Sequence, residues 1–186
     1  MDDETLMTEV RAGNASKLAL LFDRHNRPLY RYFFHLTGQR EPSEDLVQEV
    51  FFRILQYSGS FRPGTLFRPW VYQIARNVHI DFAAKHKRET SMPEDAEGRM
   101  LEFPSQERHG EDQFARKQEV AFLRRALAEL PVDKREVLVL SRFHSMKYEE
   151  IGQVLKCETS AVKVRVYRAM RELADRFYAL RGEKAS

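Results

Sequence analysis

The sequence predicts an all-α protein: two small helical domains joined by a flexible acidic linker, with a helix-turn-helix in the C-terminal domain. Apolar residues recur at helical spacing through residues 1–90 and 119–186, and no alternating strand pattern stands out. Residues 91–118 lose this periodicity and contain two prolines and two glycines. They hold seven acidic and four basic residues, whereas the blocks on either side have a basic excess. The predicted boundaries are therefore 1–90, 91–118 and 119–186.

Composition excludes several classes of protein. Cys157 is the only cysteine, so no internal disulfide can form, and a small buried residue is favoured there over a redox-sensing thiol. No apolar run reaches transmembrane length and the chain begins with acidic residues, so we expect a cytoplasmic protein without membrane insertion. The six histidines lack metal-ligand spacing, and no phosphate loop or nucleophile motif occurs. These patterns predict no metal, no cofactor and no enzyme.

Residues 148–173 form the most informative stretch. Apolar residues recur at helical spacing in two segments, 148–155 and 162–173, separated by a short polar turn. Thr159 or Ser160 can act as the N-cap of the second helix. A short turn between a short helix and a longer one is the helix-turn-helix pattern.

The second of these helices is basic. It carries Lys163, Arg165, Arg168 and Arg171 and has no acidic residue from Thr159 to Arg171. A helix with one apolar stripe and a basic remainder can lie in the DNA major groove, where its N-terminus and arginines meet phosphates and base edges. The alternative is a solvated basic face. Because the turn, the caps and the polarity agree, DNA binding is favoured, through Thr159, Ser160 and the four basic residues.

Three further helices are expected in the N-terminal half, over residues 4–11, 15–36 and 43–57. Pro28 predicts a kink or break in the second of them. Ser43 predicts the start of the third, with its hydroxyl as the cap. The third helix is expected to bury six apolar residues, Leu46, Val47, Val50, Phe51, Ile54 and Leu55. Its other face presents Asp45, Gln48 and Glu49.

Residues 58–68 read as a loop, and Pro69 suits the first turn of a helix that continues to residue 89. This helix mixes aromatic and basic residues, as stacking on unpaired bases requires. The alternative for Trp70, Phe61 and Phe67 is simple packing in the core, and the pattern leaves both interpretations open.

Three motifs in order give a family resemblance. They are EDLVQEVF at 44–51, FRPWVYQIARN at 67–77, and the C-terminal set of Leu130-Pro131, YEEIG at 148–152 and VKVR at 162–165. Together they resemble the extracytoplasmic-function (ECF) sigma factors of bacterial RNA polymerase. The resemblance implies a region 2-like domain over 1–90 that binds the core enzyme and melts the minus-ten element. It implies a region 4-like domain over 119–186 that reads the minus-thirty-five element.

The resemblance also implies roles for individual residues. Asp45, Gln48 and Glu49 would meet a basic coiled coil on the largest subunit of RNA polymerase core. The loop 61–67 would hold a flipped base with Asn77 beside it, and Trp70 and Tyr72 would support melting. The acidic linker would thread the channel for nascent RNA, and an anti-sigma factor would be a further partner. The implied minus-ten set is Phe61, Arg62, Phe67, Trp70, Tyr72, Arg76, Asn77, Lys85 and Arg88.

Three features depart from the family pattern: Pro69 replaces a small non-proline residue, Gly152 stands where alanine is usual, and Met146-Lys147 replaces a more typical glycine-containing turn. None of them removes a functional side chain. The competing functions are a free-standing helix-turn-helix repressor or activator that binds duplex operator DNA, and a helical adaptor that binds no DNA. Residues 44–90 separate these classes, because a repressor needs a sensor or dimer seam there rather than an acidic helix followed by an aromatic-basic one.

Overall fold

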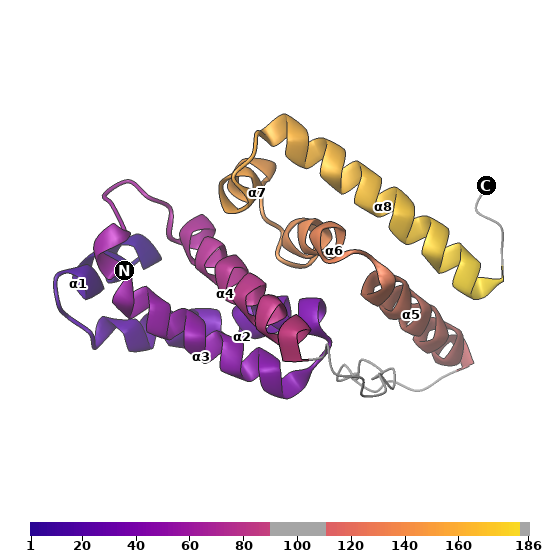
Figure 1. Ribbon diagram of the computed structural model, residues 1–186, viewed down its shortest axis with the longest axis horizontal. Coiled ribbons are helices and arrows are strands. Elements are labelled where there is room, and N and C mark those ends of the chain that lie inside the picture. Colours follow the sequence, from indigo (N-terminus) through magenta and orange to yellow (C-terminus); the bar gives the residue numbers. More distant parts are fainter. Residues whose placement is uncertain (90–110, 183–186) are drawn as a thin grey trace.

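The computed structural model describes residues 1–89 and 111–182, with side chains described for 1–87 and 117–182. Within these residues every regular element is helical, which confirms the all-α prediction (Figure 1). The N-terminal domain contains α1 (Asp3–Arg11), α2 (Lys17–Thr37), α3 (Arg40–Gln56) and α4 (Phe67–Glu89), with a short 3₁₀ turn at Ser58–Ser60. The C-terminal domain contains α5 (Glu111–Glu129), α6 (Val132–Leu138), α7 (Tyr148–Leu155) and α8 (Thr159–Arg181), with a π-helical turn at Val139–Phe143 after α6. Most of the predicted linker lies outside the described residues, and its last part already belongs to α5.

The core of the N-terminal domain forms where α2, α3 and α4 pack together and α1 closes one end. Leu21 and Leu29 from α2, Val50 from α3 and Val71 from α4 are fully buried. The expected break at Pro28 is wrong, because α2 is continuous through this residue. Proline removes one backbone hydrogen bond, and the packing of Leu21 and Leu29 on either side holds the helix together across that gap.

Two predictions about α3 are wrong. The helix begins at Arg40, so Ser43 lies in its first turn rather than at the cap; Ser43 is buried and its hydroxyl donates to the carbonyl of Gln39. Pro42 explains the earlier start, since proline fits the first turn of a helix. Leu55 is 44% exposed rather than buried, because it lies beyond the face that Val50 and Ile54 turn toward the core.

The start of α4 is held by a contact from the other end of the domain. Pro69 lies in the first turn, as predicted, and the backbone N–H of Phe67 donates to the Glu4 carboxylate at 2.9 Å. A carboxylate at a helix N-terminus satisfies an N–H that has no intrahelical partner and meets the positive end of the helix dipole. Glu4 therefore fixes the angle at which the loop before α4 enters the helix.

The helix-turn-helix forms as predicted, with α7 and α8 joined by three residues. Lys156 adopts a left-handed conformation (φ 52°), and the N–H of Cys157 donates to the carbonyl of Gly152 at 2.9 Å. The predicted cap by Thr159 or Ser160 is wrong. Helix α8 begins at Thr159, so the cap position belongs to Glu158, whose side chain makes no capping bond. The hydroxyls of Thr159 and Ser160 lie one and two residues after the cap position, where they do not cap the free N–H groups of the first turn.

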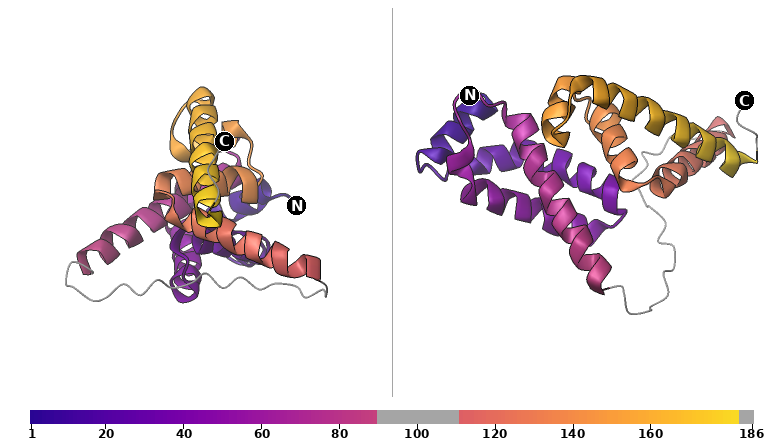
Figure 2. Two further views of the ribbon diagram at one scale, coloured as in Figure 1. Left: turned by 90° about the vertical axis from the view of Figure 1, so that its right-hand side faces the viewer. Right: turned by 45° about the horizontal axis from the view of Figure 1, so that its top comes forward.

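The two domains pack against each other. Helix α4 lies beside α7, and α2 contacts α6 and the π-helical turn (Figures 1 and 2). The buried apolar residues of both domains form one continuous core. None of the helices in the described ranges combines the length and the apolar character needed to span a bilayer.

Candidate functional site

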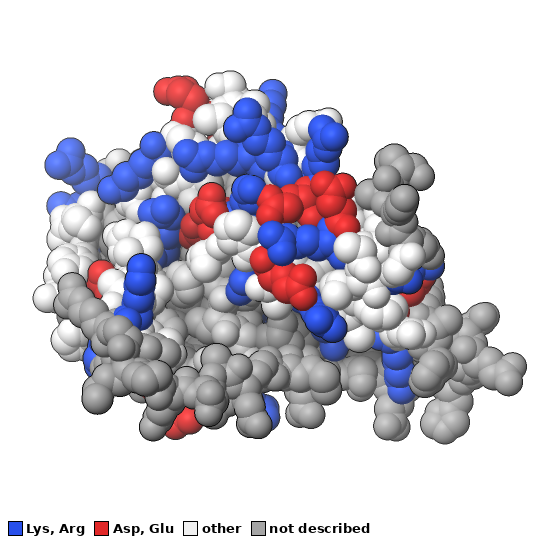
Figure 3. Space-filling model, turned by 45° about the vertical axis from the view of Figure 1, so that its right-hand side comes forward, with Lys and Arg blue, Asp and Glu red and all other residues white. Residues whose placement is uncertain are grey.

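The basic surface of the C-terminal domain lies on α8. Val162, Val166 and Ala169 are buried against the rest of the domain. This orientation leaves the predicted basic residues Lys163, Arg165, Arg168 and Arg171 exposed, together with Ser160. Figure 3 shows basic side chains gathered along the upper edge of the molecule, where α8 runs. The structure therefore brings together the residues predicted to contact duplex DNA.

Two residues on the exposed side of α8 were missed from the sequence. Tyr167 is 67% exposed and Val164 is 47% exposed, and they lie between the basic residues. An apolar side chain on such a surface can contact a thymine methyl group, and a phenol can reach a phosphate or a base edge. Helical periodicity alone could have found them, since neither falls on the stripe formed by Val162, Val166 and Ala169.

The acidic face of α3 also forms as predicted. Asp45 and Gln48 are exposed, and the Glu49 side chain is 43% exposed. Glu49 is partly neutralised, because its carboxylate accepts from Arg53 Nε at 2.7 Å. Arg53 also contacts Asp81 on α4 at 2.8 Å, so α3 and α4 are linked by an acid–base–acid chain.

One further residue, on this acidic face of α3, was also missed from the sequence. Phe52 is 63% exposed and follows Asp45, Gln48 and Glu49 at spacings of seven, four and three residues. Residues at these spacings share one side of a helix. A large apolar side chain among charged ones is typical of the centre of a protein-binding patch. The sequence could have indicated Phe52, because it is the only aromatic residue at this spacing on the polar face of α3.

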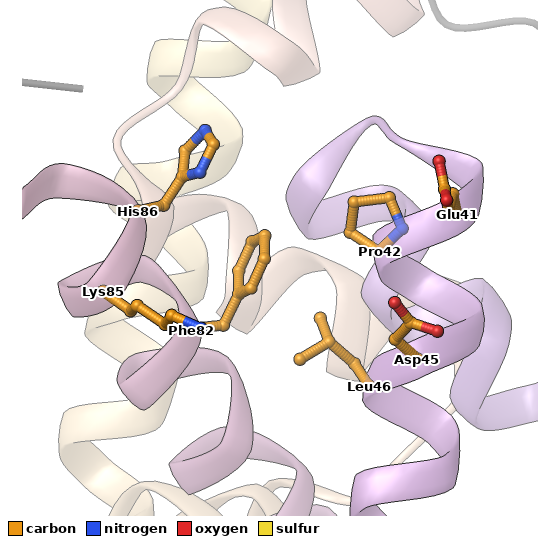
Figure 4. Close-up of a pocket in the computed structure, with 7 residues that line it drawn as sticks. All are labelled: Glu41, Pro42, Asp45, Leu46, Phe82, Lys85 and His86. Carbon is orange, nitrogen blue, oxygen red and sulfur yellow. The ribbon is translucent and has the colours of Figure 1, made fainter. Parts of the chain in front are cut away.

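A groove joins the acidic face to the basic end of α4. It encloses about 290 Å³ and is lined by Glu41, Pro42, Asp45 and Leu46 from α3 and by Phe82, Lys85 and His86 from α4. Phe82 projects into it and faces the α3 side (Figure 4). Asp45 and Lys85, which were assigned to different partners, thus line the same groove.

The aromatic residues around the loop before α4 cluster in the N-terminal domain. Phe61 and Phe67 are 2% and 0% exposed, and their rings lie 5.2 and 6.0 Å from the Trp70 ring. In this arrangement Phe61 and Phe67 are core residues, and only Trp70 is partly accessible. The loop instead exposes Arg62 and Leu66, the latter 51% exposed and absent from the predicted set.

The remaining residues of the predicted minus-ten set fall on two sides of α4. Asn77 and Lys85 are exposed. Tyr72 is 2% exposed and its hydroxyl lies 2.8 Å from Nδ1 of His144, while Arg76 Nε lies 3.2 Å from the Glu136 carboxylate. Both partners belong to the C-terminal domain. The side chain of Arg88 lies outside the described residues. The structure therefore leaves one side of α4 open and covers the other.

Two protein-family models match the chain in order. Sigma-70 region 2 matches residues 21–89, from α2 to the end of α4, and Sigma-70 region 4 matches residues 123–173, which include the helix-turn-helix. The ECF sigma factor EcfG of Rhodopseudomonas palustris is 32% identical over 155 residues, which are 81% of this chain and 79% of the relative. The chain belongs to the ECF sigma factor family.

Other ECF sigma factors match over similar lengths. SigM of Bacillus subtilis is 28% identical over 82% of this chain and 90% of its own, and SigE of Mycolicibacterium smegmatis is 31% identical over 83% of this chain. The chain spans 59% of SigE and 63% of the Streptomyces coelicolor factor BldN.

Two solved structures share the fold. One is CnrH in complex with the cytosolic domain of CnrY, with a TM-score of 0.70, 24% identity and coverage of 95% of this chain and 97% of that one. The other is the sigma factor RpoE of Bartonella quintana in complex with the anti-sigma factor NepR. Its TM-score is 0.69, with 22% identity and coverage of 85% of this chain and 94% of that one.

Proposed function

We propose that this ECF sigma factor directs bacterial RNA polymerase core to specific promoters and initiates transcription by recognising and melting them. The observation that carries the proposal is the presence of two separate charged surfaces in the order of regions 2 and 4. An exposed acidic face lies on α3, and an exposed acid-free basic face lies on α8. A repressor that binds operator DNA has no use for the first of these surfaces.

On this proposal each surface binds a different partner. The Asp45, Gln48 and Glu49 face binds a basic coiled coil on the largest polymerase subunit, with Phe52 at its centre. The face of α8 from Ser160 to Arg171 contacts the upstream duplex element, where phosphate contacts give affinity and base-edge contacts give specificity. Asn77, Trp70, Arg62 and Lys85 meet the melted strand. None of these roles requires bond chemistry, so the protein acts as a binding and positioning subunit rather than as an enzyme.

The shapes of the two DNA-binding surfaces indicate which one binds duplex DNA and which one binds the single strand. A basic helix that projects from a helix-turn-helix fits the width of the major groove. An unpaired base instead needs an accessible ring or amide, and α4 offers the partly accessible Trp70 and the exposed Asn77. We also propose that the protein works in the cytoplasm and that an anti-sigma factor controls it, in the way that RpoE of Bartonella quintana binds the anti-sigma factor NepR.

Reconstitution with polymerase core tests the proposal. The purified chain is mixed with core enzyme, and the mixture transcribes fragmented genomic DNA, after which the 5′ ends of the transcripts are sequenced. We expect a small set of start sites that share two upstream motifs and are absent with core alone. Transcripts that start without a shared motif, or binding to duplex DNA without any association with core, would favour the repressor.

A further inference from the structure

Helix α1 holds both ends of the loop 61–66, which leads into α4. Where the loop begins, Arg11 Nη1 donates to the backbone carbonyl of Phe61 at 3.2 Å. Where it ends, the Glu4 carboxylate accepts from the backbone N–H of Phe67 at 2.9 Å. Glu4 and Arg11 are seven residues apart, so they lie two turns apart on one face of α1. One short helix therefore binds the backbone at both ends of the loop.

Helix α1 is itself attached to the rest of the domain by apolar and polar contacts. Leu6 and Met7 are fully buried in the core. The two oxygens of the Asp3 carboxylate lie 2.7 Å from Arg24 Nη1 and 2.7 Å from His25 Nε2, both on α2. Because α1 is fixed in this way, its contacts with the loop restrain the loop instead of moving with it.

The loop between the two attachments is built around one turn. The N–H of Thr65 donates to the carbonyl of Arg62 at 3.0 Å, and Gly64 takes a left-handed conformation (φ 82°) in this turn. Arg62 and Leu66 are exposed. A segment with exposed side chains and few buried contacts opens locally at low cost in free energy. The backbone contacts from α1 therefore matter most where the chain enters and leaves this turn.

The loop carries part of the surface that the proposed function assigns to the melted strand. Arg62 lies in the loop, and Trp70 follows in the first turn of α4 with its ring 5.2 Å from that of Phe61. Helix α1 precedes residues 21–89, which match Sigma-70 region 2, so the matched region does not include this support. A loop that is ordered before DNA arrives loses little conformational entropy when it captures a base.

We propose that Glu4 and Arg11 are positioning residues for strand opening, which hold the loop 61–66 in the arrangement that receives an unpaired base. This inference rests on the proposed function, because it takes the loop and Trp70 as contacts of the melted strand. Both residues act through the loop backbone. Glu4 also places a negative charge at the N-terminus of α4, where it meets the positive end of the helix dipole.

Two pairs of variants test the two contacts. Glu4→Ala and Arg11→Ala remove them. Glu4→Gln keeps an acceptor for the N–H of Phe67, and Arg11→Lys keeps a donor for the carbonyl of Phe61. If the hydrogen bonds themselves position the loop, the conservative pair should behave nearly as wild type.

Matched controls make the same changes away from the loop. Glu9→Ala alters the same helix at a residue whose carboxylate lies 3.5 Å from Asn14 Nδ2. Arg27→Ala removes an exposed arginine of α2. Far-UV circular dichroism of every variant reports whether the helices are retained.

The first readout is the mobility of the loop in the free full-length chain. Trp70 is the only tryptophan, so acrylamide quenching of its fluorescence reports the exposure of the aromatic cluster beside the loop. We expect a higher quenching constant in Glu4→Ala and Arg11→Ala than in wild type, and the highest in the double variant. The conservative variants and the controls should match wild type.

Hydrogen exchange measured by NMR adds a test at a single atom. The amide of Phe67 should exchange at least about tenfold faster in Glu4→Ala, because it loses a hydrogen bond to a charged acceptor. Wild-type quenching in the double alanine variant, or wild-type exchange of Phe67 in Glu4→Ala, would overturn the inference. These measurements need neither polymerase nor DNA, so they do not depend on the proposed function.

The second readout is strand opening by holoenzyme at the start sites that the transcription experiment identifies. Gel shifts measure binding to closed promoter, and permanganate footprinting of unpaired thymines measures opening. We expect Glu4→Ala and Arg11→Ala to bind closed promoter as wild type but to open about three- to tenfold less of it, because the loop must then be ordered during capture. Glu4→Gln and Arg11→Lys should restore most of the opening.

The two readouts together separate a positioning role from a merely structural one. A more mobile loop with normal opening, or an opening defect that the conservative variants do not restore, would overturn the positioning role. Failure of wild-type holoenzyme to open any promoter would count against the proposed function, and the measurements on the free chain would still decide whether α1 holds the loop.

Discussion

At the scale of single residues, Gly152 shows why one departure from the family pattern matters. A Cβ built at this position would lie 2.7 Å from the backbone oxygen of Cys157, closer than such atoms approach. The turn of the helix-turn-helix therefore passes so near α7 that only glycine fits without a shift. Helix propensity alone favours alanine at this position, because glycine weakens a helix by up to about 1 kcal/mol relative to alanine.

Gly152→Ala should accordingly destabilise the protein. The gain in helix propensity is up to about 1 kcal/mol, whereas forcing an extra methyl group against backbone costs about 1–3 kcal/mol. We expect a net loss of about 1 kcal/mol in the free energy of unfolding, measured by urea denaturation. Ala161→Gly, at a partly exposed position in the first turn of α8, provides a comparison in which only propensity changes. A more stable Gly152→Ala protein would mean that the turn relaxes freely.

The arginines of α8 are the residues at which promoter recognition can be tested singly. Arg165→Ala or Arg168→Ala should weaken binding of holoenzyme to promoter DNA. If the residue contacts a guanine edge, the loss should be about 1–3 kcal/mol and confined to one base position; if it contacts a phosphate, the salt slope should fall by about one. Gel-shift titrations at several salt concentrations distinguish these results. Arg125→Ala, an exposed arginine of α5, should bind as wild type.

Unchanged promoter affinity in Arg165→Ala, in Arg168→Ala and in the double variant would remove α8 from the interface. Association with polymerase core should be normal in each of these variants, because Arg165 and Arg168 lie on α8 of the C-terminal domain and not on the acidic face of α3.

At the scale of elements, α3 is the helix whose exposed face should decide binding to polymerase. Asp45→Lys combined with Glu49→Lys should abolish association with core, since the face becomes basic toward a basic partner. Phe52→Ala should weaken it while leaving all charges in place, as expected for an apolar anchor. Pull-down with core at moderate salt measures both. A chain with Glu149→Lys and Asp175→Lys, two exposed acids of the other domain, is the charge-matched control and should bind normally.

The elements also show what could be predicted from sequence. The positions of α3, α4, α7 and α8 follow from apolar spacing, because each helix buries one stripe. The starts of α3 and α8 were mispredicted from Ser43 and Thr159, since a hydroxyl caps a helix only when the chain turns at that residue. Here Pro42 allowed an earlier turn in the first case, and Glu158 took the cap position in the second. Local chemistry thus predicted the helices better than their first residues.

At the scale of the whole molecule, the contact between the domains could not have been predicted. The hydrogen-bonded residues Tyr32 and Glu136 are 104 residues apart, and the local sequence around each of them does not indicate the other as its partner. The contact depends on how the two folded domains meet. The burial of Phe61 and Phe67 was left open for another reason, because an aromatic residue next to a basic one suits both a core and a base-stacking surface.

The same interface should make stability depend on pH. Burial lowers the pKa of His144 to about 4, helped by the positive charges of His35, Arg68 and Arg31, and burial lowers that of His79 to about 4 as well, helped by Arg135 and Arg76. The folded state binds these protons more weakly than the unfolded state. The free energy of unfolding therefore has its full value above pH 6.5 and decreases as the pH falls toward 4. At pH 5 each histidine should lower it by about 2 kcal/mol relative to its value above pH 6.5.

Urea denaturation at pH 7 and pH 5 measures this loss. His144→Asn keeps an acceptor for the Tyr72 hydroxyl without a titrating group, so the difference between the two pH values should shrink by roughly half of the histidine contribution. Carboxylates titrate in both proteins and cancel in the comparison. An equal pH dependence in the two chains would show that His144 is protonated as readily in the folded state as in the unfolded one.

Strand opening tests the central claim most directly, because it separates a sigma factor from any protein that binds only duplex DNA. Asn77 is exposed on α4 and offers both a donor and an acceptor to the edge of an unpaired base. Flipping a base costs a few kcal/mol, which contacts to that base must offset. The measurement is permanganate footprinting of unpaired thymines in promoter complexes of holoenzyme that carries wild type, Asn77→Ala, or Gln56→Ala as an exposed-amide control.

We predict that Asn77→Ala still binds the closed promoter through α8 but opens far less of it than wild type or Gln56→Ala. Part of the loss should return on a template that is already mismatched across the minus-ten region, since melting then no longer depends on capture of the base. Normal opening of duplex promoter by Asn77→Ala would contradict the role of this residue. The absence of opening by wild-type holoenzyme, at the start sites that the transcription experiment identifies, would contradict the account as a whole.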